Sequence, residues 1–319
     1  MRAIAALALV TGCGFQVNGS AAPGDARPDA PDAIDAIDAP DGAPTCMDRW
    51  LDGTIRFQPP VPLTSVNSAS YDRDPYITRD ELTLYTSTGR NGGSTGADIF
   101  IARRAAVTDD FGTPERNGSA STDESDTKLS LVLDGQTAFL GSGRPNGNNN
   151  IDVWEATSTN GTFGGFTQMH LGAVNSGGNE HDPFISADGR HLYLAPDTGG
   201  TQRIVVASRA TAADNFSAPV RVEELYSGAG DADPALSDDE RVIVFSSHRP
   251  DPAHAASNLW FATRASAAGA FSAPIAVPDL DTDLDEGDPH LSVDGCRLYF
   301  ARYVAGTDWD LFVAQATTP

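Results

Sequence analysis

Five Asp-Gly or Asp-Glu pairs of this 319-residue chain follow one another at nearly constant spacing. Successive pairs are 54, 54, 51 and 55 residues apart, and they are Asp80-Glu81, Asp134-Gly135, Asp188-Gly189, Asp239-Glu240 and Asp294-Gly295. A fixed period of this size is typical of repeat architectures, in which each unit needs its neighbours to bury an apolar face. The repeat therefore predicts a fold, whereas nothing in it specifies a chemical reaction.

Each repeat contains four strand-length segments separated by Gly or Pro. In the first repeat these segments are 74–78, 82–85, 98–102 and a fourth that follows Phe111. The third segment is the most regular, and it returns as 152–156, 203–207, 258–262 and 310–314. The fourth segment follows an aromatic residue again at Phe166, Phe216 and Phe271. Four strands per repeat, without helical periodicity anywhere, predict the blades of a β-propeller.

The two ends of the repeat region predict how the blades close. The fourth-strand pattern occurs once before the first full repeat, at 57–61, while the last repeat stops after its third strand at Ala314. A spare strand at the start can complete the last unit, which removes the exposed edge of an open array. We therefore predict an all-β, five-bladed propeller of four-stranded blades over residues 46–319, closed by its N-terminal strand.

The first thirteen residues are typical of an export signal. Arg2 precedes the apolar run 3–10, which is too short to span a bilayer, and small residues precede Cys13. The segment resembles the bacterial lipoprotein signal, which implies that Cys13 is the lipidated first residue of the mature protein. An ordinary signal peptide with a chance cysteine is the alternative.

Residues 14–45 consist mostly of Ala, Pro, Asp and Gly. They include too few large apolar groups to offset the entropy of ordering the backbone, so we predict a disordered tether. Together with Cys13, the tether predicts an exported protein that is anchored to the cell envelope, at the outer membrane, through lipid alone.

The composition is strongly acidic, and it excludes some partners. With 21 Lys and Arg against 44 Asp and Glu, the net charge is −23. This charge opposes binding of nucleic acid or of anionic lipid headgroups by the folded domain.

Two cysteines remain after Cys13. Cys296 directly follows the turn of the fifth repeat, and Cys46 lies eleven residues before Phe57, whose strand completes that same blade. Because both belong to one blade and an exported protein can form disulfides, we predict a Cys46–Cys296 bond. Two unpaired thiols are the alternative.

Three sequence elements recur with the strands: an Asp-Pro start as at Asp182-Pro183, a Ser-x-Asp-Gly turn as at 186–189, and a Ser-, Arg- and Gly-containing loop at 87–93 before Asp98-Ile99-Phe100. In these motifs residues 65–316 resemble the TolB-like β-propeller repeat. The resemblance implies an envelope location and, as in some members, protein or peptidoglycan-complex partners. The second repeat departs from the pattern, with Lys128 where the others have Asp.

Aligned repeats place two acidic positions near the start of the first strand. The earlier position holds Asp72, Asp126, Glu180, Asp231 and Glu286, and the later one holds Asp74, Lys128, Asp182, Asp233 and Asp288. Because the first strand of a blade lines the central channel, these side chains should surround one mouth of it. Arginines that we expect to meet them there are Arg90, Arg144, Arg249 and Arg302.

Three roles for these carboxylates are open. They can cap turns and bond neighbouring blades, which every repeat requires. Clustered carboxylate oxygens also suit Ca²⁺, although the dense Asp-x-Asp-x-Asp loop of strong calcium sites is missing, and we otherwise expect no cofactor. The pattern-breaking residues Arg73, Lys128 and His181 can instead form a ligand site.

Five-bladed propellers also include glycosidases, which need two carboxylates in unequal environments. Carboxylates that repeat identically around a ring argue against such inequality. No Gly-x-Ser-x-Gly motif is present, and the six histidines are scattered, as surface or packing residues would be. We therefore expect a monomeric, non-catalytic binding or scaffold module with an envelope protein or a glycan as partner. A glycan-acting hydrolase is the alternative.

Overall fold

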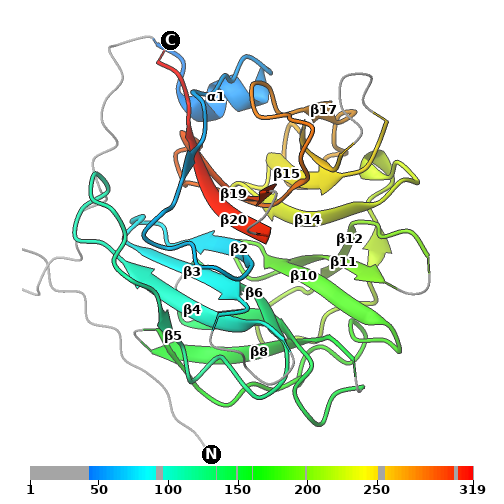
Figure 1. The fold of residues 1–319 in the computed structure, drawn as a ribbon. Coiled ribbons are helices and arrows are strands. Elements are labelled where there is room, and N and C mark those ends of the chain that lie inside the picture. Colours follow the sequence, from blue (N-terminus) through cyan, green and yellow to red (C-terminus); the bar gives the residue numbers. More distant parts are fainter. Residues whose placement is uncertain are drawn as a thin grey trace, which may run out of the picture. The chain divides into compact units, whose positions relative to one another are not determined.

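The structure is a computed structural model that describes residues 43–318 except 91–95, 134, 149, 160, 198–199, 251–255 and 305–307. Cys13, residues 14–42 of the predicted tether and Asp134 lie outside the described residues. The described chain forms five four-stranded antiparallel sheets arranged as a propeller (Figure 1), so the predicted fold is confirmed. No helix among the described residues has the length and apolarity needed to cross a membrane.

Each blade uses four strands in chain order except the last. Blade one contains β2 (Asp72–Ile77), β3 (Thr83–Thr88), β4 (Asp98–Arg103) and β5 (Glu115–Arg116). Blade two contains β6 (Asp126–Leu131), β7 (Thr137–Ser142), β8 (Asp152–Thr159) and β9 (Thr162–Phe163). Blade three contains β10 (Asn179–Ile185), β11 (His191–Asp197), β12 (Val205–Ser208) and β13 (Val220–Arg221). Blade four contains β14 (Asp231–Leu236), β15 (Val242–Ser247), β16 (Asn258–Thr263) and β17 (Ile275–Ala276).

Blade five is closed by the two ends of the described chain. It contains β18 (Glu286–Leu291), β19 (Arg297–Val304), β20 (Asp308–Gln315) and the early strand β1 (Val61–Pro62). Val61 pairs with Val313, and a further bridge joins Phe57 to Ala316, as the strand count predicts. Cys46 Sγ is bonded to Cys296 Sγ, with the two Cα atoms 5.2 Å apart.

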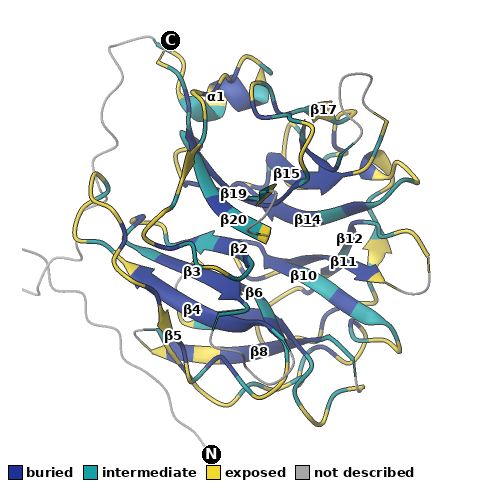
Figure 2. Ribbon diagram, in the orientation of Figure 1, coloured by how far each residue is buried: buried dark blue, intermediate teal, exposed yellow. Residues whose placement is uncertain are grey.

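The apolar core lies between blades rather than within them. One cluster joins Ile99 of blade one to Leu129 of blade two, and another joins Leu84 of blade one to Tyr299 of blade five. Figure 2 shows the strands largely buried and the connecting loops exposed. Each blade therefore depends on its neighbours, which is the expected energetics of a repeat protein.

A short helix, α1 (Cys46–Leu51), was not predicted from the sequence. Thr45 caps it and forms a reciprocal capping box with Asp48. Trp50 is fully buried against Phe57 and Phe261, and its indole Nε1 donates to Gly295 O at 2.9 Å. Six residues are too few to show helical periodicity, so tertiary packing and capping determine this helix.

Blade two also departs from the expected strand order. Its outer strand β9 precedes Phe166. This is because β8 continues to Thr159, which pairs with Thr162 of β9. The segment after Phe166 contributes only the bridge between Thr167 and Glu155. The aromatic residue is thus a packing position rather than a reliable marker of the fourth strand.

Candidate functional site

The earlier acidic position of the repeats forms a set of buried ion pairs within the blades. The pairs are Arg90–Asp72 at 2.5 Å, Arg144–Asp126 at 2.7 Å, Arg249–Asp231 at 2.8 Å and Arg302–Glu286 at 2.8 Å, measured between nitrogen and oxygen. The first three aspartates also hold the preceding loop; Ser68 N, for example, donates to Asp72 Oδ2 at 2.6 Å. We call these four acids and Glu180 of blade three the outer ring. The arginine partners give the outer ring a structural role in the other four blades.

Blade three lacks an arginine partner among the described residues. Its outer-ring acid, Glu180, accepts from Ser176 Oγ, while its Oε2 is buried without a hydrogen-bond partner among the described residues. Burial raises the pKa of Glu180 above its ordinary value. A buried carboxylate without a cation favours its protonated form.

We expect Glu180→Gln to leave the protein at least as stable as wild type at neutral pH. Because the pKa of Glu180 is raised in the fold, its stabilising contribution is complete below its ordinary pKa and is lost as the pH rises through the folded value. Glutamine resembles the protonated acid and has no such pH dependence. Urea unfolding of both proteins near pH 4 and near pH 7 measures the difference. A large loss of stability in the variant at neutral pH would contradict this account.

The later position forms an inner ring of five residues with left-handed backbone. The φ angles are 55° at Asp74, 43° at Lys128, 58° at Asp182, 53° at Asp233 and 52° at Asp288. At each of them the pairing of the first two strands shifts register, so a β-bulge occurs at the same place in every blade. Such bulges re-aim a side chain, and aspartate tolerates this conformation better than most residues.

Three inner-ring aspartates accept hydrogen bonds from other residues of the fold, and two of them are Asp74 and Asp233. Asp74 Oδ2 accepts from Ser87 Oγ and from Lys128 N, the latter at 3.3 Å. Asp233 Oδ2 accepts from Ser246 Oγ at 2.6 Å and from Asp288 N at 3.1 Å. These bonds join each aspartate to the backbone of the next blade.

Asp288 is held by the non-repeated residue Arg73. Arg73 Nε donates to Asp288 Oδ2 at 2.7 Å, and its Nη2 lies 3.4 Å from Oδ1. The guanidinium carbon also lies 4.4 Å from the ring centroid of Trp309. Since Arg73 belongs to blade one and both partners to blade five, this contact strengthens the seam where the propeller closes.

The expectation that repeated carboxylates share equal environments is wrong. Burial, and then the charge of Asp288, raise the pKa of Asp74 to about 7. Burial alone would also raise the pKa of Asp288, but Arg73 and then Lys128 outweigh it and hold that pKa below its ordinary value. Burial and then Asp233 place the pKa of Asp182 well above its ordinary value. The inequality arises because Arg73 and Lys128 occur only once each around the ring.

A pocket of about 580 Å³ opens at the mouth of the channel. Asp74, Asp182 and Asp233 of the inner ring line it, whereas Lys128 and Asp288 do not. Of the outer ring, only Glu286 reaches it. The five positions between the two rings all line it, and they hold Arg73, Thr127, His181, Ala232 and Gly287. These five residues differ in every blade, so the pocket has an individual shape inside a repeated frame.

Several residues of the pocket wall lie outside the repeated motifs. Trp309 and Asp308 reach it because β19 and β20 are eight residues long, against six in β3 and β4. Aligned third strands would have located Trp309, which takes the place of Ala97, Gln202 and Ser257 in other blades. Tyr71, His248 and Asp285 also line the wall.

Aromatic side chains lie two residues after the inner-ring position in the first strands of blades one, three and five. The ring centroid of His290 is 4.4 Å from that of Tyr76 and 6.0 Å from that of Phe184. Burial, with a contribution from Lys128, lowers the pKa of His290 to about 3, so this imidazole is neutral. None of the three lines the pocket. His290 is therefore a packing residue.

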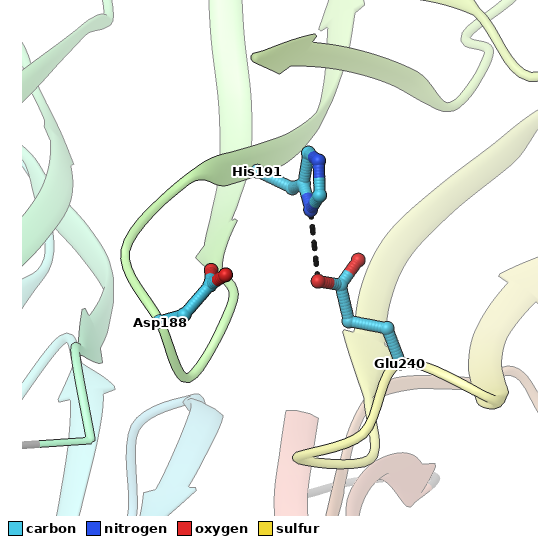
Figure 3. Close-up of side chains that lie close together, drawn as sticks. All are labelled: Asp188, His191 and Glu240. Carbon is cyan, nitrogen blue, oxygen red and sulfur yellow. Dashed lines mark hydrogen bonds and ion pairs between the residues drawn. The ribbon is translucent and has the colours of Figure 1, made fainter. Parts of the chain in front are cut away.

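A second group of titratable side chains, Asp188, His191 and Glu240, lies at the turn after the first strand (Figure 3). His191 Nδ1 is 2.8 Å from Glu240 Oε1, and Glu240 Oε2 accepts from Tyr193 OH at 3.1 Å. The same arrangement of hydrogen bonds occurs between blades five and one, where Glu81 accepts from Arg297 and Tyr299. The glutamate thus joins two blades, and His191 takes the place of an arginine.

We expect His191 to make stability depend on pH. The hydrogen bond to Glu240 raises the pKa of His191 above its ordinary value, so its contribution is complete below that value and is lost as the pH rises through the folded pKa. His191→Arg should remove this dependence, because Arg297 fills the equivalent position. Denaturant unfolding near pH 5 and near pH 8 gives the change in unfolding free energy with pH for each protein. We expect this change to differ between wild type and His191→Arg, by less than about 1 kcal/mol. An identical pH dependence in both would contradict the assignment.

No protein-family model matches the chain, and no curated protein matches its sequence. The catalytic domain of a Coprinopsis cinerea GH62 α-L-arabinofuranosidase aligns with a TM-score of 0.54 and 14% identity, covering 82% of this chain and 97% of that chain. An endo-1,4-β-xylanase from Bacteroides thetaiotaomicron VPI-5482 aligns with a TM-score of 0.52 and 18% identity, covering 80% of this chain and 97% of that chain.

TolB from Acinetobacter baumannii is also similar, with a TM-score of 0.44 and 14% identity over 77% of this chain. The aligned region spans 55% of that TolB chain, and at this score the similarity adds nothing to the fold assignment. At such identities the hydrolase structures establish the fold and not the reaction. The protein is therefore a five-bladed β-propeller, similar in fold to glycoside hydrolases.

Proposed function

We propose that this propeller is a ligand-binding module of the cell envelope, and that its ligand enters the channel-mouth pocket. The observation that carries the proposal is the carboxylate of Asp182. It lines the pocket, yet it accepts no hydrogen bond from any described side chain or amide, whereas Asp74, Asp233 and Asp288 are each held by the fold. A polar group on a pocket wall that the fold does not use is available to a ligand.

Capture from envelope extract tests this function. The mature full-length protein, solubilised in detergent, should retain a defined component that Asp182→Asn retains poorly. Asp214→Asn is the matched control, because it removes one carboxylate from an exposed loop that does not line the pocket, where Thr211 donates to the Asp214 carboxylate. Equal capture by wild type and Asp182→Asn would refute a role for Asp182 in binding that component.

The envelope location is part of the proposal and rests on Cys13 and the tether. Cys13→Ser should release the protein from membranes or leave it unprocessed, since the thiol is the only acceptor for the lipid in this segment. Fractionation and mass measurement of the mature protein decide between these outcomes. A variant that stays with membranes at the wild-type mature mass would exclude lipidation.

A glycan-acting hydrolase is the second candidate, and the unequal inner-ring carboxylates favour it. Asp74 is poised to hold a proton near neutral pH while Asp288 remains ionised. One observation opposes it, because Asp288 is engaged by Arg73, whose Nε donates to Asp288 Oδ2 at 2.7 Å.

Release of reducing ends from arabinan, xylan and peptidoglycan tests the hydrolase directly. If the second candidate is right, wild type should release them and Asp74→Asn should not. Unchanged polysaccharides, together with retained capture of a component, would favour the binding module.

A further inference from the structure

Asp182 is the one inner-ring acid whose carboxylate lacks a donor. In blades one and four, the second strand supplies Ser87 and Ser246, which pair beside the inner-ring aspartate and donate to it. The corresponding residue of blade three is Ala195, opposite His181. Asp182 therefore has no serine donor from its own blade, and it is partly exposed on the pocket wall. The site thus has a hydrogen-bond acceptor that needs a donor from outside the fold.

The chain itself shows what kind of cation the inner ring accepts. Lys128 is 2% exposed, and its Nζ has no hydrogen-bond partner among the described residues. Its positive charge nevertheless lowers the pKa of each of the four inner-ring aspartates, as expected of an ammonium close to them. A primary ammonium, rather than a fifth carboxylate with a metal, is therefore built into the ring.

The charge around the ring is only partly compensated. Four aspartates face two cations, Lys128 and Arg73, and Arg73 is committed to Asp288 through both of its contacting nitrogens. Protons supply the remaining compensation, as the raised pKa values of Asp74 and Asp182 indicate. A cationic group entering from the pocket can replace those protons, and it finds Asp182 free to accept its hydrogen bonds.

We propose that the ligand group bound in the channel-mouth pocket is a primary ammonium, with Asp182 as its main acceptor and Asp74 and Asp233 beside it. This inference rests on the proposed binding function. The three N–H donors of an ammonium match carboxylates on three blades, and its single charge limits repulsion by Lys128. Ca²⁺ needs six to eight oxygens and would meet twice that repulsion. The same chemistry occurs in a lysine side chain, an amino sugar or a polyamine.

Matched pairs of probes test the ammonium and distinguish its sources. The mature full-length protein is titrated calorimetrically with an acetyl-Ala-Lys-Ala-amide peptide, glucosamine and spermidine. Each is compared with its acetylated form, in which the amine carries an acetyl group and no charge. We expect at least one amine to bind about tenfold or more tightly than its acetylated form, the range for hydrogen bonds to charged groups. The probe with the highest affinity identifies the source.

Two variants assign that binding to the ring. Asp182→Asn should weaken amine binding about tenfold or more, while Asp214→Asn should leave it unchanged. Lys128→Met should strengthen it, because the competing internal ammonium is gone; cooperative unfolding shows that this variant is folded. Amine binding that Asp182→Asn does not alter would overturn the inference.

The remaining outcomes separate this inference from the function on which it rests. Ala232→Trp fills the pocket wall without removing a charge. If Ala232→Trp abolishes capture from envelope extract and no amine binds, the pocket function stands and the ammonium is wrong. If Ca²⁺ binds instead and Asp182→Asn abolishes that binding, a metal site replaces the ammonium. If neither capture nor amine binding depends on the pocket, both proposals fall.

Discussion

Replacing both Cys46 and Cys296 with serine is expected to lower the free energy of unfolding by about 5 kcal/mol. The bond links residues separated by 250 positions, so it removes a large loop entropy from the unfolded chain. It also fixes α1 against blade five, where Trp50 is buried and donates to Gly295. Without the disulfide, this anchoring depends on the packing of Trp50 and on hydrogen bonds such as that from Trp50 to Gly295.

Denaturant unfolding of the oxidised protein, the reduced protein and the double variant measures this effect. The reduced protein and the double variant should agree, because both lack the same cross-link. Cys13 remains in all three, so the comparison isolates the pair. A loss below about 1 kcal/mol would mean that the unfolded chain is already compact or that the folded bond is strained.

Arg144→Met is expected to destabilise the protein by about 3 to 5 kcal/mol, the usual cost of leaving a buried charge without its partner. Asp126 is fully buried and depends on Arg144 Nη2 at 2.7 Å. The same nitrogen also donates to Ala120 O at 2.7 Å, and the guanidinium carbon lies 4.3 Å from the ring centroid of Phe166. Methionine keeps part of the packing and loses every hydrogen bond.

The double variant Arg144→Met, Asp126→Asn separates charge from packing. Asparagine removes the unpaired negative charge, so the double variant should recover part of the lost unfolding free energy. A double-mutant cycle measures the recovered part. Arg190→Met is the matched control, since the Arg190–Asp188 pair is exposed and should contribute below about 1 kcal/mol. Similar losses in Arg144→Met and Arg190→Met would contradict a special role for the buried pairs.

The sequence predicted the parts of this molecule that repeat. The five blades, the strand that closes them and the pairing of Arg90, Arg144, Arg249 and Arg302 with the outer ring follow from aligned positions. Position in the repeat predicts contact because each blade has the same geometry.

The residues that give the pocket its character occur once, and alignment of repeats does not reveal them. Trp309 reaches the mouth through a hairpin that is longer than its equivalents. The unequal protonation of Asp74 and Asp288 depends on where Arg73 and Lys128 point, which a repeat pattern does not specify. Helix α1 is likewise determined by a cap and by one buried tryptophan.

The strand that closes blade five sets the order in which this protein can finish folding. Val61 pairs with Val313, so blade five is completed only when strands from opposite ends of the propeller sequence meet. Blades one to four draw their strands from consecutive sequence, so their pairing is local. Until β1 and β20 pair, blade five has an open edge, and the long-range pairing that slows folding is still to be made. A chain truncated before β20 would therefore leave β1 and β19 without this partner, and the ring would stay open.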